Sequence, residues 1–459
     1  MRLCVLVWLL LLAFGPLPGT AATWLVLPDG SGDWPTIQMA IDSSSWGDTI
    51  VLGCGVFHEH GIVLRSGLTV VGETGSPECV VVDGDGMDHV FVCSHVDEVA
   101  MKGLTITGGF AYGATWPEYV GGGMWVMNSS PQIEQCVFRL NEAETMGGGI
   151  YLGLSSATVV DCVFEENTIG ASGEGGGIYV TNGSSPLVER CRFIGCEAYR
   201  GGALCCLGVQ AETFVSCDFV GNRATQGGGA VHSGSQAAPT FESCTFHSNW
   251  AYARGGAIYC LNGGGATLTN CTLSDNESQY GAGGIECWAY GWATLENTIL
   301  AFSTRGASVY EDGSGVFTFS CTDVYGNAGG DWVDGIASQA GDQRELLGRS
   351  PLLRPGGGRL HAGRRLPLPG RPGVRPRGGV GRGVRRLHGD RGDDLGGDQE
   401  GVQIVGSKIA RVEGAGSPKG IGSPAPSFSW GTKPGPLSQD DDLSRRRAAF
   451  RLHPDQVNA

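Results

Sequence analysis

The stretch GGGIYV at residues 175–180 decides the fold, because close copies of it recur along the chain. Each copy places two or three small residues, mostly glycine, before a pair of strand-forming residues. The other copies are GGGMWV at 121–126, GGGIYL at 147–152, GGALCC at 201–206, GGAVHS at 228–233, GGAIYC at 255–260 and, more weakly, AGGIEC at 282–287. The apolar residue after the glycines recurs at steps of 26 to 28 residues. Self-similarity at such a period predicts a repeat architecture.

Further positions keep the same register. A cysteine follows each glycine pair, replaced by threonine in the seventh unit, and Phe or Leu stands two residues beyond it. These residues are Cys136, Cys162, Cys191, Cys217, Cys244, Cys271 and Thr298, then Phe138, Phe164, Phe193, Phe219, Phe246, Leu273 and Leu300. Three residues further on, most units carry an asparagine, which we expect to mark a turn because asparagine tolerates left-handed backbone conformation.

Each unit is interpreted as short strands separated by turns. In the third unit, the strands are expected at 178–180 and around 188–193, with TNGSSP at 181–186 as the turn between them. No unit shows a helical period. A stack of such coils places like residues about 4.8 Å apart and buries a continuous interior, in which Ile150, Ile178, Phe164 and Phe193 should lie.

The repeated GGA[IL] and FxxN pattern resembles the repeats of chlamydial polymorphic membrane proteins, and more broadly the right-handed parallel β-helix, or pectate-lyase-like, superfamily. The resemblance covers roughly residues 24–335. It implies an all-β, right-handed parallel β-helix solenoid of about ten or eleven coils between about residues 45 and 330. A short N-terminal helix is expected to cap it, with Asp33 as N-cap and Ile37, Ala40 and Ile41 facing the first coil. These motifs specify the fold and leave the activity open.

Two terminal segments are set apart from the β-helix, which we place at 23–341. Residues 1–22 combine Arg2, an apolar run and a small-residue site, a pattern typical of a secretory signal peptide. A secreted or cell-surface location is therefore expected, and no later apolar run is long enough to span a membrane. Residues 342–459 form a basic, low-complexity tail, which we expect to be disordered and to result from a reading-frame shift near Gly341.

Charge separates the same parts of the chain. Residues 1–343 hold 35 Asp plus Glu against ten Lys plus Arg, whereas residues 344–459 hold 21 Lys plus Arg against 11 Asp plus Glu. The acidic first part disfavours nucleic acid as a partner, because like charges repel.

The candidate functional residues lie at the outward position of the first strand in each unit. We assign glycan binding to Trp125, Tyr151, Tyr179, His232 and Tyr259. On one exposed face, their stacked rings would pack against the C–H faces of sugars. The alternative is that Tyr and Trp only stabilise the outer face of a sheet.

The repeated cysteines are expected to be mostly buried free thiols that pack as small apolar groups. Cys79 with Cys93, and Cys205 or Cys206 with a neighbour, are the better candidates for disulfides. No metal and no cofactor is expected, since zinc sites need a closed set of four ligands. The string DGDGMD at 83–88 lacks the distal Glu of an EF-hand loop, which favours a coil turn over a cation site.

Two functions remain open. The first is a secreted, non-catalytic β-helix that binds an extracellular polysaccharide, a cell-surface protein or another surface. The alternative is a polysaccharide lyase or glycoside hydrolase, which needs carboxylates that converge with each other or with a basic group. Charged residues of the repeats fall at unrelated positions, so we assign no catalytic residue and favour the first function.

Overall fold

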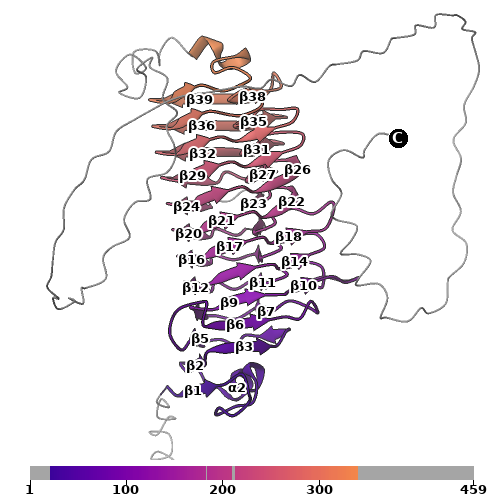
Figure 1. The fold of residues 1–459 in the computed structure, drawn as a ribbon, viewed down its shortest axis with the longest axis vertical. Coiled ribbons are helices and arrows are strands. Elements are labelled where there is room, and N and C mark those ends of the chain that lie inside the picture. The colour runs from indigo at the N-terminus through magenta and orange to yellow at the C-terminus, as the bar shows by residue number, and fades with distance from the viewer. Residues whose placement is uncertain (1–20, 182, 209–211, 340–459) are drawn as a thin grey trace, which may run out of the picture. The chain divides into compact units, whose positions relative to one another are not determined.

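The computed structural model describes residues 21–181, 183–208 and 212–339. These residues form stacked coils whose strands build four parallel sheets (Figure 1). The predicted all-β parallel solenoid is confirmed. Most of the predicted signal peptide and the whole of the predicted tail at 342–459 lie outside the described residues.

Three long sheets enclose the interior. Sheet A consists of β1 (Thr23–Val26), β2 (Thr49–Leu52), β5 (Thr69–Gly72), β8 (Ala100–Lys102), β12 (Gln132–Glu134), β16 (Thr158–Val160), β20 (Leu187–Glu189), β24 (Thr213–Val215), β28 (Thr240–Glu242), β32 (Gly265–Thr269), β36 (Trp292–Glu296) and β39 (Val316–Ser320). Sheet B consists of β3 (Gly55–His58), β6 (Val80–Asp83), β9 (Thr105–Thr107), β13 (Val137–Arg139), β17 (Val163–Glu165), β21 (Arg192–Ile194), β25 (Asp218–Val220), β29 (Thr245–His247), β33 (Thr272–Ser274), β37 (Ile299–Ala301) and β40 (Asp323–Tyr325). Sheet C consists of β4 (Ile62–Val63), β7 (Phe91–Ser94), β11 (Met124–Met127), β15 (Ile150–Gly153), β19 (Ile178–Thr181), β23 (Leu204–Leu207), β27 (Val231–Gly234), β31 (Ile258–Leu261), β35 (Ile285–Trp288) and β38 (Val309–Glu311).

A fourth, shorter sheet was not expected from the sequence. Sheet D consists of β10 (Phe110–Ala111), β14 (Glu142–Ala143), β18 (Thr168–Ile169), β22 (Glu197–Arg200), β26 (Arg223–Gly227), β30 (Trp250–Ala251) and β34 (Glu277–Ser278). A complete coil runs through sheets C, A, B and D before the glycines return the chain to sheet C one level higher. The expected strand around 188–193 is two strands, β20 and β21, which meet at a corner where Arg190 has a left-handed φ of 52°.

The interior follows the predicted register. Ile150 pairs with Ile178 and Phe164 pairs with Phe193 on adjacent strands, and all four side chains are fully buried. The Phe column from Phe138 to Phe246 stacks ring on ring, with centroids 4.7–5.2 Å apart. The predicted stacking of like residues is therefore confirmed.

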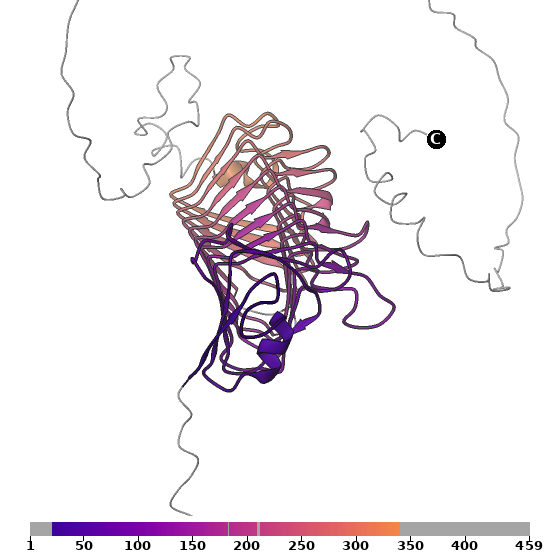
Figure 2. The same ribbon diagram turned by 60° about the horizontal axis from the view of Figure 1, so that its bottom comes forward.

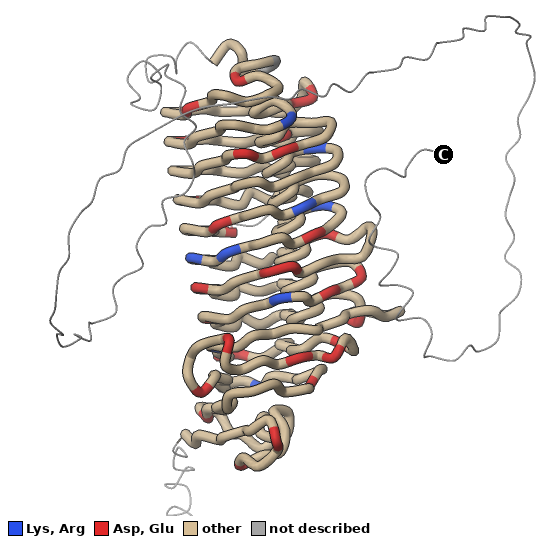
Figure 3. Tube along the Cα trace, in the orientation of Figure 1, with Lys and Arg blue, Asp and Glu red and all other residues tan. Residues whose placement is uncertain are grey.

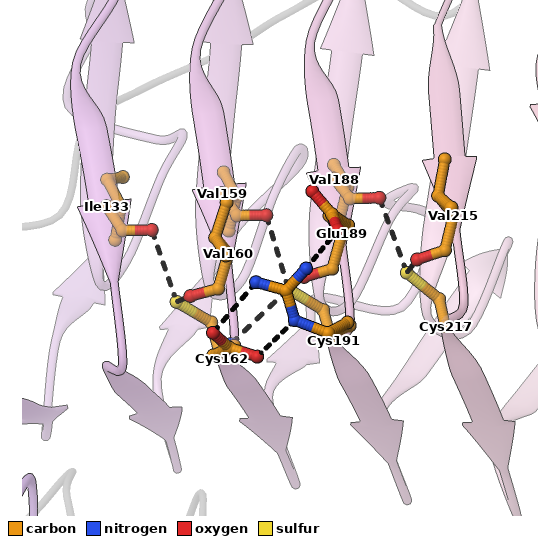
Figure 4. Close-up of polar contacts among 11 residues, drawn as sticks. Ile133, Val159, Val160, Cys162, Val188, Glu189, Cys191, Val215 and Cys217 are labelled. Carbon is orange, nitrogen blue, oxygen red and sulfur yellow. Dashed lines mark hydrogen bonds and ion pairs between the residues drawn. The ribbon is translucent and has the colours of Figure 1, made fainter.

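The cysteine column lies at the corner between sheets A and B and hydrogen-bonds the backbone there (Figure 4). The Sγ of Cys162 donates to Val160 O at 3.3 Å or to Ile133 O at 3.5 Å, and it accepts the N–H of Cys136 at 3.4 Å. Thr298 makes the same contacts in the seventh unit, accepting the N–H of Cys271. The six stacked cysteines are buried and free, as predicted. This corner of the coil therefore favours a small side chain that can both donate and accept a hydrogen bond.

The role expected for the asparagines is wrong in one respect. The left-handed residue is the one before each asparagine, such as Leu140 with φ 53° and Glu166 with φ 51°. Asn141 and Asn167 are fully buried instead, and the N–H and the side-chain amide of Asn141 both donate to Oδ1 of Asn167. The amides form a ladder inside the corner because each amide oxygen can accept both bonds from the coil below.

The glycines of the repeat make the return to sheet C. Gly175 has φ +73°, which glycine adopts without steric cost, and a Cβ on Gly176 would meet Gly202 O at 2.3 Å. Adjacent coils thus approach backbone to backbone at this edge, and any side chain would separate them.

Helix α2 (Ile37–Ser43) caps the N-terminal end of the solenoid, as predicted (Figure 2). Ile37, Ala40 and Ile41 are fully buried. The N-cap is Thr36 and not Asp33: its hydroxyl accepts the N–H of Met39, while the carboxylate of Asp33 accepts the N–H of Leu25. No helix among the described residues is long and apolar enough to cross a membrane.

The disulfide assignment from the sequence is wrong. Cys79 bonds Cys54 on the adjacent coil, with Cα atoms 4.9 Å apart, while Cys93, Cys205 and Cys206 are buried free thiols. The reason is side-chain direction: Cys93 points into the interior from sheet C, whereas Cys54 and Cys79 stack at the partly exposed corner between sheets A and B.

Candidate functional site

The predicted site residues do form one column on the outer face of sheet C. In register, the column runs through Trp125, Tyr151, Tyr179, Cys205, His232, Tyr259, Glu286 and Tyr310. The rings of Tyr151 and Tyr179 stack with centroids 5.6 Å apart, and those of His232 and Tyr259 stack at 5.4 Å.

The predicted exposure of this column is wrong. Tyr151, Tyr179, His232 and Tyr259 are buried, with Tyr151 only 1% exposed, and Trp125 alone of the five predicted site residues is partly exposed. A sugar ring cannot reach a buried ring face. Four of the five residues to which glycan binding was assigned therefore offer no surface to a glycan.

In most units, the side chain that precedes the pair of glycines covers the column. Val120 belongs to the same buried cluster as Tyr151, and the Glu174 carboxylate accepts the Cys205 S–H at 3.6 Å. Arg200 in turn bonds both Glu174 and the side chain of Gln226. Each covering residue lies one coil before the column residue it shields, about 30 residues away in sequence.

Cys205 and His232 are paired on adjacent strands of this covered column, a juxtaposition that could serve nucleophilic chemistry. Burial raises the pKa of the Cys205 thiol well above its ordinary value. Burial, with the nearby Arg200 as a second cause, lowers the pKa of His232 to about 3. The thiol therefore stays protonated and the imidazole stays neutral, so neither group is prepared for catalysis.

The column opens at its C-terminal end, where a pocket of about 400 Å³ lies beside Glu286. Its lining residues are Ala253, Arg254, Tyr280, Gly281, Ala282, Glu286, Trp288, Ala307 and Tyr310. The last strand of sheet D, β34, ends just before Tyr280, which is 71% exposed. The rings of Trp288 and Tyr310 lie 6.3 Å apart and belong to β35 and β38.

The buried carboxylate of Glu286 holds two of the side chains that line this pocket in place. Its side chain is 1% exposed, and its Oε1 accepts the indole N–H of Trp288 at 2.7 Å and a guanidinium N–H of Arg254 at 2.9 Å. Its Oε2 accepts the backbone N–H groups of Gly255 and Ala282 at 3.1 and 3.0 Å. Both oxygens are thus saturated, which fits a buried charge that is paired and hydrogen-bonded.

Arg254 fixes one face of Trp288. Its guanidinium carbon lies 3.4 Å from the centroid of the indole ring, a close cation–π contact. Glu286, Arg254 and Trp288 therefore form a preorganised unit, in which the indole is held at the ring nitrogen and covered on one side. The pocket offers aromatic surface and N–H donors, and its one cation among the described lining residues is already neutralised.

An exposed aromatic patch continues from the pocket onto sheet D. The rings of Tyr280 and Tyr252 meet edge to face at 5.2 Å, and Trp250 lies 6.3 Å from Tyr252. Arg223 covers the ring of Trp250 at 4.8 Å. Large contiguous exposed apolar patches mark interaction sites, whereas single exposed apolar residues are common on protein surfaces.

A family model for the right-handed β-helix region matches residues 97–193, 118–226 and 176–340, which together cover more than half of the chain. The chain belongs to the right-handed β-helix family. The comparison with curated proteins finds no match.

Among solved structures, this β-helix protein is similar to pectate lyase Pel9A, with 14% identity, a TM-score of 0.39, and coverage of 68% of this chain and 81% of that one. Polygalacturonase from Erwinia carotovora ssp. carotovora is 11% identical, with a TM-score of 0.32 and coverage of 66% and 96%. Pectin methylesterase from Aspergillus niger is 13% identical, with a TM-score of 0.30 and coverage of 71% and 97%. At these identities the likeness concerns the fold alone.

Sequence reasoning about this β-helix missed most of the pocket. Glu286 occupies the outward position of the seventh unit, but Tyr310 lies one coil beyond the seven units, where the glycine pair is replaced by Ala307 and Ser308. The density of aromatic residues in WAYGW at 288–292 was the available signal. It could not show that Trp288 turns toward Arg254 while Tyr290, 78% exposed, does not line the pocket.

Proposed function

We propose that this β-helix is a secreted, non-catalytic protein that binds a polysaccharide at the pocket formed by Tyr280, Trp288 and Tyr310. The observation that carries the proposal is the buried Glu286, which holds Trp288 and Arg254 in place beside two exposed tyrosine rings. Rigid aromatic surfaces with polar edges suit sugars, since rings pack on the C–H faces while N–H and O–H groups take the hydroxyls.

The charge of the pocket argues for a neutral sugar chain. Arg254 is the only cation among the described lining residues, and Glu286 neutralises it at 2.9 Å. Acidic side chains also outnumber basic ones along the described coils (Figure 3). A polyuronate or another polyanion would be repelled here, whereas a neutral chain would not.

Catalysis at this pocket is disfavoured because its carboxylate, Glu286, is fully hydrogen-bonded. Glycoside hydrolysis needs two carboxyl groups about 5–10 Å apart, one of them free to exchange a proton. Glu286 is the only carboxylate among the described lining residues, and four donors occupy its oxygens. A lyase or hydrolase therefore stays the weaker candidate.

Export is the second element of the proposal. It rests on the signal-peptide pattern at 1–22 and on the Cys54–Cys79 disulfide, a bond that persists in oxidising compartments. The aromatic patch of Trp250 and Tyr252 would supply further contacts to a chain that is longer than the pocket.

Titration calorimetry with a panel of neutral and acidic oligosaccharides tests the proposal. Tyr280→Ala and Tyr310→Ala should each weaken binding of a neutral oligosaccharide at least about tenfold, equivalent to 1.4 kcal/mol. Tyr290→Ala is the matched control, because Tyr290 is an exposed aromatic residue on the same coil that does not line the pocket.

Unchanged affinity in the double variant Tyr280→Ala, Tyr310→Ala would remove the pocket from consideration. Release of shortened or unsaturated products during the same incubations would instead establish the lyase or hydrolase alternative. Binding that grows with uronate content would contradict the charge argument.

A further inference from the structure

Three side chains that can bind a metal converge on two adjacent coils at the end of sheet B. His58 ends β3 and Asp83 ends β6, and the two residues are paired in register. Asp85 follows two residues later with a left-handed φ of 54°. One ligand atom from each side chain lies within 4.8 Å of the others, and His58 Nδ1 lies 2.9 Å from Asp85 Oδ1.

Backbone hydrogen bonds hold the turn on either side of Asp85. Gly84 N–H donates to Thr107 O at 2.9 Å and Gly86 N–H donates to Gly108 O at 2.7 Å, so the next coil holds the turn. Oδ1 of Asp83 accepts the N–H of Asp85 at 2.9 Å. A Cβ on Gly108 would lie 2.1 Å from that same oxygen, so the absence of a side chain there leaves room for the carboxylate.

The donor set selects the kind of cation. One imidazole nitrogen and two carboxylate oxygens suit a divalent transition metal, whereas calcium takes six to eight oxygen ligands. Tetrahedral zinc with bonds of about 2.0–2.1 Å places its ligand atoms about 3.4 Å apart, within the 4.8 Å that already separates these three side chains, two of them exposed and one partly exposed. Two carboxylates also balance the charge of the ion.

We propose that His58, Asp83 and Asp85 form a Zn²⁺ site that joins the first two coils of sheet B. The chain already closes the other end of the same strand pair, because Cys54 and Cys79 immediately precede β3 and β6. The metal would thus complete a second cross-link between β3 and β6, next to the coil that helix α2 caps. The side chains of His58 and Asp85 are 62% and 50% exposed, which leaves an open coordination position for water.

This site is independent of the proposed polysaccharide pocket, since its residues lie in the first two coils and the pocket lies in the last ones. Cys321 is an exposed free thiol that could bind zinc by itself, so the test uses the full chain with Cys321→Ser as its background. The probe is ZnCl₂, titrated into chelator-treated protein by calorimetry.

One equivalent of Zn²⁺ should bind, and thermal unfolding of the loaded protein should begin at a higher temperature than that of the metal-free protein. His58→Ala and Asp85→Asn should each weaken binding at least about tenfold and abolish the thermal shift. His60→Ala and Asp88→Asn are matched controls, because both residues lie in the same turns and outside the cluster. Absence of saturable binding, or an isotherm that His58→Ala leaves unchanged, would overturn the proposal.

Discussion

Gly227 stands directly against the ring of Tyr259: a Cβ on Gly227 would lie 2.6 Å from Cδ1 of that ring. In five of the other six units the equivalent position carries a side chain that shields the outward column of sheet C, and in the seventh unit it is Gly281. Those five residues are Val120, Met146, Glu174, Arg200 and Arg254. At Gly227, the ring of Tyr259 itself fills the space of the missing side chain.

Gly227→Ala should therefore destabilise the protein by about 1–3 kcal/mol, since the ring must move to admit a methyl group. In a Tyr259→Ala background the same substitution should cost much less, because the clash is gone. Urea unfolding of the four proteins gives the coupling energy between the two sites. Strict additivity would show that the methyl group is accommodated without the ring.

The register of the stacked strands could be predicted from the sequence, whereas the solvent exposure of the outward column of sheet C could not. Ile150 and Ile178 lie one repeat apart, and stacking of identical units forces like residues together. Whether Tyr151 reaches solvent depends on Val120, which precedes a different pair of glycines, and on Trp116, whose ring meets that of Tyr151 edge to face at 5.3 Å. A pattern that repeats every 27 residues or so contains no signal for such a contact between unlike positions.

The other wrong or missing predictions concern the coils at either end, which lack the glycine repeat. Cys54, His58 and Cys79 lie before the first glycine repeat, where no period aligns one coil with the next. Their pairing follows from the register of β3 with β6, which places Gly55 beside Val80. Tyr310 likewise lies outside the repeat, one coil beyond the last glycine pair, where no period aligns it with an earlier coil. The proposed metal site and one wall of the pocket thus lie outside the repeat, and there the sequence offers the least guidance.

The cysteine column should depend on hydrogen bonding at the corner and only secondarily on the volume of the sulfur atom. Cys162→Ser keeps a donor and an acceptor, as Thr298 does naturally. Cys162→Ala leaves the N–H of Cys136 without its partner inside the protein. We expect Cys162→Ala to be less stable than Cys162→Ser by about 1–3 kcal/mol, measured by urea unfolding. Equal stabilities would mean that the column acts through packing alone.

Thiol labelling should separate Cys321 from the buried cysteines. Cys321 is exposed, whereas burial raises the pKa of Cys93 and of Cys196 to about 12. Only the thiolate reacts quickly with a disulfide reagent, so the native protein should show a fast phase that Cys321→Ser removes. Cys93→Ser should leave that phase unchanged, and reaction of the buried thiols should require a denaturant. A fast phase that survives Cys321→Ser would contradict this assignment.

Glu212 should make stability fall as pH rises. Its carboxylate is fully buried, and neither oxygen has a hydrogen-bond partner among the described residues. Burial raises its pKa to about 7 in the folded protein, against about 4.3 in the unfolded chain. Between these two values the folded state binds more protons than the unfolded state does, so the penalty is absent below about pH 4 and complete above about pH 7.

The full penalty is on the order of 4 kcal/mol and is reached about one pH unit above the folded-state pKa. Glu212→Ala should therefore stabilise the protein at pH 8 and have little effect at pH 4, because the equivalent position holds alanine in other coils, at Ala157 and Ala266. Glu242→Ala is the control, since Glu242 is an exposed residue of sheet A on a neighbouring coil. Denaturant unfolding between pH 4 and 8 measures both variants, and parallel stability curves for wild type and Glu212→Ala would exclude a buried titrating carboxylate at this position.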